Sequence, residues 1–174
     1  KADTIVVSHN ASSDGKIFNK KITKINDNDA KIKFINEIPY FIGYCWRFVT
    51  KRRFLETNKI FFMDDARQLE DEEFVCKLLF FSKSIVFFNE KYYFKRLQGH
   101  DGLASTTNFN SVKSCIVVLK GLLKLSSLKK ISSQKKIYCR KRIEKLLTDL
   151  YPLLFLTSVK NLIILSKYIY KNLN

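Results

Sequence analysis

Residues 61–96 read FFMDDARQLEDEEFVCKLLFFSKSIVFFNEKYYFKR, and this stretch decides how the chain is expected to fold. Between Asp64 and Glu73 it gathers six of the sixteen acidic residues of a chain whose net charge is +16. Carboxylates held close together repel one another, so an acidic cluster in a basic protein indicates a candidate functional site. We call residues 64–73 the acidic segment.

Apolar side chains follow the acids at helical spacing. Phe74, Leu78 and Phe81 recur every three or four residues, which predicts an amphipathic helix whose first turn holds residues 70–73. A purely structural explanation of these acids is also open, because negative charge in the first turn is favoured by the helix dipole. Residues 84–89 and 91–95 are rich in aromatic and β-branched side chains, and they predict two short strands separated at Asn89 and Glu90.

Several short motifs occur in a fixed order across residues 39–106. They are Trp46, 51–55 (KRRFL), 60–62 (IFF), 70–74 (EDEEF), 85–90 (IVFFNE), 92–96 (YYFKR) and 104–106 (AST). This ordered series resembles the C-terminal half of the family 2 glycosyltransferases, which have the GT-A fold. The resemblance covers less than half of the chain, and its specificity lies in the order of the motifs. It implies an α/β protein with a partial GT-A-like mixed sheet and flanking helices.

The resemblance also implies an activity and roles for particular residues. The expected reaction is transfer of a sugar, with inversion, from a nucleotide-diphosphate sugar to a glycan or lipid-linked acceptor. Asp71 is expected to be the catalytic base and Glu70 to orient the acceptor or the neighbouring backbone. The expected substrate-binding residues are Arg96, Lys95, Trp46 and Ser105. The remaining acids of the segment are interpreted as loop or solvent-facing residues: Asp64, Asp65, Glu72 and Glu73.

The family's donor-binding half normally precedes these motifs, and the chain has no room for it. Since Lys1 is not an initiator methionine, we expect the sequence to be a piece of a longer protein that is inactive alone. The expected cofactor, divalent Mg²⁺ or Mn²⁺, would then be bound mainly by residues absent from this chain. Asp27, Asn28 and Asp29 have the spacing of the family's Asp-x-Asp metal motif, but their polar surroundings favour an ordinary loop.

Composition narrows the class of protein. With 174 residues and 46% hydrophobic residues, the chain can form a core, which argues against disorder throughout. Its four cysteines, Cys45, Cys76, Cys115 and Cys139, show no CxxC pair, so reduced thiols are expected and structural zinc is not. No signal peptide or uninterrupted apolar run of about 20 residues is present, which predicts a cytoplasmic location.

The N-terminal part predicts local structure of two kinds. Residues 4–8 (TIVVS) and 31–35 (KIKFI) are interpreted as strands, the second from its alternation. Residues 44–57 are interpreted as a short helix with Trp46, Phe48 and Leu55 facing inward. The basic triplet 51–53 is expected to face solvent, as such triplets more often do than bind phosphate.

The C-terminal part is strongly basic. Residues 102–174 hold fourteen Lys and Arg against two acids, Glu144 and Asp149. The pattern predicts helices over 111–125, 134–150 and 153–170, the last beginning at Pro152. The middle helix is expected to bury a stripe of Ile143, Leu146, Leu147 and Leu150, with cations on its other side: Lys135, Lys136, Arg140, Lys141 and Arg142.

These features predict two parts: residues 1–106, the glycosyltransferase-like domain, and residues 107–174, a basic amphipathic tail. The tail either packs on the domain or lies on the anionic cytoplasmic face of a membrane. One competing class is a non-catalytic membrane-surface or partner-binding module, in which the tail is functional and the helix after the acids is only structural. Nucleic-acid binding is the other competing class, because the pI near 9.7 and the many aromatic residues fit it. No recognised nucleic-acid motif is present, so this class is not favoured.

Overall fold

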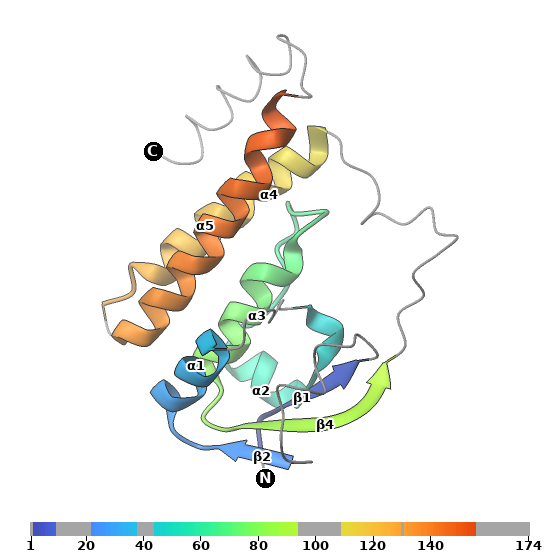
Figure 1. Ribbon diagram of the computed structural model, residues 1–174, viewed down its shortest axis with the longest axis vertical. Helices are drawn as coiled ribbons and strands as arrows, with labels where there is room; N and C mark the ends of the chain where they lie inside the picture. Colours follow the sequence, from blue (N-terminus) through green and yellow to red (C-terminus); the bar gives the residue numbers. More distant parts are fainter. Residues whose placement is uncertain (1, 10–21, 38–43, 94–108, 130, 156–174) are drawn as a thin grey trace. The chain divides into compact units, whose positions relative to one another are not determined.

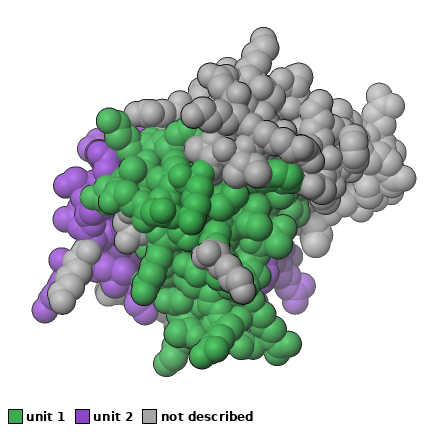
Figure 2. All heavy atoms as spheres, turned by 90° about the horizontal axis from the view of Figure 1, so that it is seen from below, with its two compact units in different colours: residues 1–61, 74–98 green, residues 62–73, 99–174 purple. Residues whose placement is uncertain are grey.

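The computed structural model describes residues 2–9, 22–37, 44–93, 109–129 and 131–155. Within these residues the protein has one four-stranded sheet and five α-helices, so the predicted mixed α/β class is confirmed. The chain divides into two compact units, coloured in Figure 2: unit 1 is Lys1–Phe61 with Phe74–Gln98, and unit 2 is Phe62–Glu73 with Gly99–Asn174. The predicted division between residues 106 and 107 lies outside the described residues and stays a prediction.

Unit 1 is built around the sheet, whose strand order is β2-β4-β1-β3. The strands are β1 (Thr4–His9), β2 (Ile22–Ile25), β3 (Phe48–Thr50) and β4 (Ile85–Tyr93). Figure 1 shows β4 lying between β2 and β1. β1 and β4 are parallel, and each pairs with an antiparallel edge strand. Parallel strands in the centre of a sheet are covered on both faces, so they are formed by apolar residues. Val6 of β1 and Ile85 and Phe87 of β4 are accordingly buried.

Strand β1 confirms the prediction over residues 4–8, but β4 corrects the prediction of two strands. It runs without interruption across Asn89 and Glu90. Its pairing with β1 shifts register after Val7, so an irregularity occurs where the sequence suggests a break. A bulge keeps a strand continuous while changing its twist, and the sequence signal for a bulge resembles that for a turn.

Residues 31–35, predicted as a strand, belong to helix α1 (Asn28–Glu37). The carboxylate of Asp27 accepts a 2.6 Å hydrogen bond from the backbone N–H of Ala30, as a helix N-cap does. Ile32 and Ile35 lie three residues apart and are both buried, so the apparent alternation is one buried helical face. The local pattern fits both periods, and packing in unit 1 selects the helix.

Residues 44–57 form three short elements, so the single helix predicted there is wrong. They are the 3₁₀ helix η2 (Cys45–Arg47), strand β3 and helix α2 (Arg52–Thr57). Arg47 is buried and its Nε donates to the carbonyl of Val7 at 3.3 Å, which ties η2 to the sheet. The basic triplet 51–53 is exposed, as predicted.

Helix α3 (Glu70–Phe81) confirms the helix predicted after the acids. Its C-terminal end is held in unit 1, where the hydroxyls of Thr4 and Ser82 form a buried 2.9 Å hydrogen bond. The fully buried Lys31 of α1 donates from Nζ to the carbonyl of Ser82. Phe81, expected on the apolar face, is 40% exposed at the end of the helix. The boundary between the two units falls within α3, after Glu73.

Unit 2 contains two long helices, α4 (Phe109–Ser126) and α5 (Ser133–Phe155). They lie side by side (Figure 1), and the thiol of Cys115 on α4 contacts the carbonyl of Leu146 on α5 at 3.7 Å. α4 agrees with the helix predicted over 111–125. α5 continues through Pro152, so the prediction that a third helix begins there is wrong; residues 156–170 lie outside the described residues. Because proline removes an intrahelical N–H donor, it usually marks a helix start or a break, and α5 departs from that rule.

The buried face of α5 differs from the predicted stripe. Tyr138, Cys139, Arg142 and Leu146 are buried, whereas Leu147 is 50% exposed. Ile143, also in the predicted stripe, is only half-buried, and the side chain of Leu150 lies outside the described part. The helix is rotated relative to the prediction because Arg142 enters the interior of unit 2.

The predicted cationic side of α5 is partly confirmed. Lys136, Arg140 and Lys141 are exposed and Lys135 is half-buried, but Arg142 belongs to the buried face. The four cysteines all lie in the described part of the chain and form no disulfide there, and three of them are buried: Cys76, Cys115 and Cys139. None of the described helices combines the length and the apolar character that crossing a membrane requires.

Candidate functional site

The acidic segment leads into helix α3 through a constrained residue. Leu69, immediately before the helix, has a backbone φ of 62°. This left-handed conformation costs on the order of 1 kcal/mol for a residue with a side chain, and such residues persist where surrounding contacts hold them. The carbonyl of Leu69 accepts a 3.0 Å hydrogen bond from the N–H of Glu72, so the first helical turn closes directly on it.

The loop before Leu69 is attached to helix α4. The backbone N–H groups of Arg67 and Gln68 donate to the hydroxyl of Ser114, at 3.1 and 3.3 Å. Ser114 and Ala66 are both buried. This attachment fixes the approach of the chain to the acidic turn. Asp64 and Asp65, upstream of it, are exposed, as predicted.

Glu72 is buried in unit 2 and paired with Arg142 of α5. The guanidinium Nε donates to Oε2 of Glu72 at 2.7 Å, and Nη2 donates to Oε1, which makes a two-point ion pair. Both side chains are at most 10% exposed. The prediction that Glu72 faces solvent is therefore wrong. A charge can be buried at this place because a planar guanidinium matches both carboxylate oxygens.

Glu73 is also buried, which corrects the prediction that it faces solvent. It packs against Gly121 of α4, where an added Cβ would lie 2.9 Å from the Cγ of Glu73. Only a residue without a side chain leaves room for Glu73 there. This contact explains a glycine in the interior of a helix, where it is otherwise unfavourable by about 1 kcal/mol relative to alanine.

Glu70 and Asp71 complete the first turn and are half-buried. Four consecutive acids thus divide into two with buried side chains and two that keep access to solvent. Consecutive helical residues point in different directions, so anchoring Glu72 and Glu73 leaves Asp71 on another side of the turn. A partly exposed carboxylate on an anchored helix end can accept a proton or a hydrogen bond from a bound hydroxyl group.

The other residues predicted for the site lie either in unit 1 or outside the described residues. Trp46 lies in unit 1, half-buried, with its ring stacked on Tyr44 at a centroid distance of 5.2 Å. Lys95, Arg96 and Ser105 lie outside the described residues. Their roles stay predictions.

Sequence reasoning missed Arg142 and Gly121, the residues that anchor the acidic turn. A signal for Arg142 exists, since Tyr138, Cys139, Arg142 and Leu146 share one face of a helix. Choosing this face over the aliphatic stripe requires knowledge that a buried acid lies opposite. For Gly121 the signal is its position within an otherwise apolar helical pattern.

The described residues contain no group of three or more His, Cys, Asp or Glu side chains that could hold a metal ion. The expected Mg²⁺ or Mn²⁺ stays a prediction. Asp27, in the Asp-x-Asp spacing, caps helix α1. Comparisons of the chain with protein-family models, with curated proteins and with solved structures gave no match.

Proposed function

We propose that the chain is the acceptor-side part of a nucleotide-sugar-dependent glycosyltransferase with a GT-A-like fold, and that Asp71 is its catalytic base. The ordered motifs over residues 39–106 are the first support for this assignment. The order of elements is the second, since the acidic turn opens helix α3 and the helix leads into β4, a central strand of a mixed sheet. The acceptor would be a glycan or a lipid-linked sugar.

The observation that carries the proposal is the unequal burial of the four acids in the first turn of α3. Glu72 and Glu73 are buried in unit 2, and Glu70 and Asp71 keep access to solvent. A first turn whose acids served only the helix dipole would need no such anchoring, because that effect operates at exposed positions as well as at partly buried ones. Anchoring on one side restrains the carboxylate on the other, which a positioned base requires.

The proposed reaction gives separate roles to Asp71 and Glu70. The acceptor hydroxyl attacks the anomeric carbon of the donor sugar while Asp71 takes the hydroxyl proton, and the bond from that carbon to the diphosphate breaks. Direct displacement inverts the anomeric centre. Glu70 would hold a neighbouring acceptor hydroxyl by accepting its hydrogen bond. A bound divalent cation would offset charge on the departing diphosphate, but none of the described residues is assigned to it.

The family resemblance proposes further donor contacts. Arg96, with Lys95 beside it, would bind diphosphate oxygens, for which a planar guanidinium is suited. Trp46 and Ser105 would contact the substrates. These residues stand in the proposal on the resemblance alone.

The test is a nucleotide-release assay on the full-length natural protein with a panel of nucleotide-diphosphate sugars, Mg²⁺ or Mn²⁺, and glycan acceptors. Asp71→Asn keeps the size of the side chain and removes its basicity. We expect turnover to fall by roughly a factor of 10² to 10⁴, the usual contribution of a general base. Donor affinity, measured by calorimetry, should stay within about twofold, because the base acts on the acceptor.

Asp65→Asn is the matched control, since Asp65 is an exposed acid of the same segment. It should leave turnover unchanged. If both variants turn over at the wild-type rate, Asp71 is not the base; if no donor is cleaved by the wild-type protein across the panel, the glycosyltransferase assignment is wrong.

A further inference from the structure

The end of the α4–α5 hairpin exposes aliphatic side chains. Leu123, Leu128 and Ile137 are 46%, 43% and 44% exposed. Leu123 lies three residues before the end of α4 and Ile137 four residues after the start of α5, so each is within about 6 Å of the helix end along its axis. Leu128 lies in the connection between the helices. We call these three residues and the lysines beside them the hairpin-end surface.

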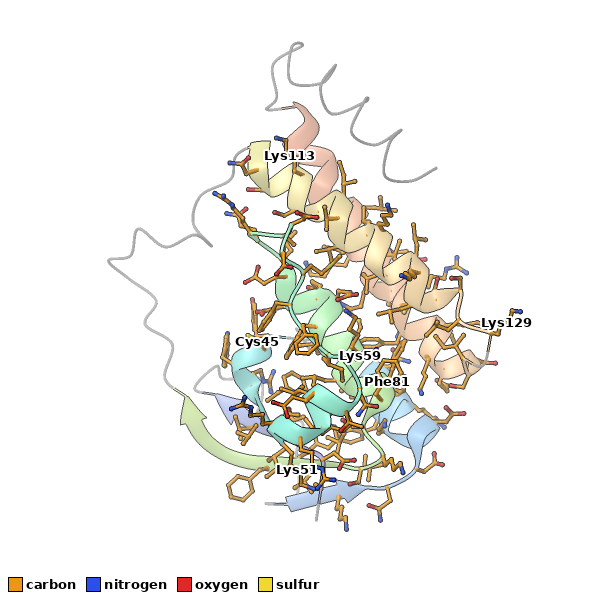
Figure 3. All side chains as sticks on the ribbon, turned by 180° about the vertical axis from the view of Figure 1, so that it is seen from behind. Cys45, Lys51, Lys59, Phe81, Lys113 and Lys129 are labelled. Carbon is orange, nitrogen blue, oxygen red and sulfur yellow. The ribbon has the colours of Figure 1, made fainter. Side chains whose placement is uncertain are left out.

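Lysines surround these aliphatic side chains. Lys120, Lys124, Lys129 and Lys136 are exposed. Figure 3 shows Lys129 at the connection between α4 and α5, pointing away from both helices, with Lys113 at the opposite end of α4. These four lysines lie toward the same end of the hairpin as the exposed leucines and isoleucine, whereas Arg140, Lys141 and Lys145, also exposed, continue along α5 away from that end.

Acidic side chains of the same sequence region do not offset this charge. No Asp or Glu occurs between Gly102 and Ile143. Glu144, the next acid, forms a 2.8 Å ion pair with Arg140. The loop of the acidic segment meets α4 at Ser114, about 18 Å along the helix from its end at Ser126. Glu73 of the same segment packs against Gly121, about 8 Å from that end, and its side chain is buried.

We propose that the hairpin-end surface docks on an anionic lipid membrane, with the aliphatic side chains entering the interface and the lysines contacting lipid phosphates. Charge complementarity selects this partner, since lysines beside exposed aliphatic groups match the two layers of a lipid surface. A single-stranded nucleic acid would instead favour aromatic side chains on which bases stack, and the exposed large apolar residues here are aliphatic. The proposal does not depend on the glycosyltransferase assignment.

The test is co-sedimentation of the full-length protein with two kinds of vesicle: phosphatidylcholine alone, and phosphatidylcholine mixed with phosphatidylglycerol. We expect binding to the anionic vesicles that weakens as salt is raised. The double variant Lys124→Gln, Lys129→Gln should lower the partition coefficient about 30-fold, because each lysine near an anionic surface contributes about fivefold. Leu128→Ser should lower it roughly fivefold.

Two matched controls separate docking by this surface from attraction by net charge. Lys33→Gln with Lys83→Gln removes the same charge from exposed positions in unit 1, and Leu147→Ser removes an exposed leucine far along α5. Both should change vesicle binding less than about threefold. Equal losses in test and control variants would overturn the proposal, as would an absence of vesicle binding. Binding to a single-stranded oligonucleotide without binding to vesicles would assign the surface to nucleic acid instead.

Discussion

Replacing Arg142 by methionine is the most direct test of how the acidic turn is held. Methionine keeps an unbranched apolar stem and removes the guanidinium that donates twice to Glu72. Because both side chains are at most 10% exposed, the variant leaves a carboxylate buried without its cation. Breaking a buried pair in this way costs about 3–5 kcal/mol. That loss is a large part of the 5–15 kcal/mol that stabilises a typical domain.

The assay is urea unfolding followed by circular dichroism, and helix α5 supplies its own control. Arg140 lies two residues away and pairs with Glu144, but the two side chains are 82% and 58% exposed. Exposed pairs of this spacing contribute about 0.3–0.5 kcal/mol. Arg140→Met should therefore barely change the free energy of unfolding, although it removes the same charge from the same helix.

A double variant distinguishes loss of the pair from loss of packing. Glu72→Leu combined with Arg142→Met removes both charges, and it should be more stable than Arg142→Met alone, since no charge is left buried without a partner. The reasoning is refuted if Arg142→Met costs no more than Arg140→Met. It is also refuted if removing Glu72 gives no recovery.

Two further predictions concern contacts and chemistry inside unit 2. Gly121→Ala should destabilise the protein by about 1 kcal/mol in thermal unfolding, because the new methyl group meets Glu73, although alanine is the better helix former; in a Glu73→Ala background the same change should stabilise, and stabilisation in both backgrounds would contradict the close contact. Burial raises the pKa of the Cys139 thiol from 9.0 to about 11, so the folded protein keeps this proton while the unfolded chain loses it. Stability should therefore be full below pH 9.0 and fall by on the order of 2 kcal/mol as pH rises to about 11. Cys139→Ala should reduce that fall in alkaline urea titrations, and an unchanged fall would show that other groups cause it.

Some elements follow from local pattern because one period dominates their residues. In β1, β-branched residues run together, and in α3 and α4 apolar residues recur at helical spacing within well-marked ends. Residues 31–35 could not be assigned in this way, because their apolar residues fit two periods. Ile32 and Phe34 alternate as in a strand, whereas Ile32 and Ile35 lie on one helical face. The Asp27 cap is a local signal for the helix, but it becomes decisive only when the buried face has a sheet to cover.

In the candidate site, too, some features follow from the local sequence and others only from tertiary contacts. The acidic cluster and its place at a helix start are readable in the residues around Asp71, since spacing and charge are local properties. The partner of Glu72 cannot be identified from the local sequence, because Arg142 is 70 positions away along the chain.

The sequence by itself determined the mixed α/β class, the helix that begins at the acids and the basic character of the C-terminal part. Only the tertiary structure decided that Glu72 and Glu73 are buried, that Arg142 turns inward and that Gly121 makes room for an acid. The physical reason is that a period in the chain specifies which face of an element is apolar, whereas the burial of a charge depends on a partner brought to it by folding.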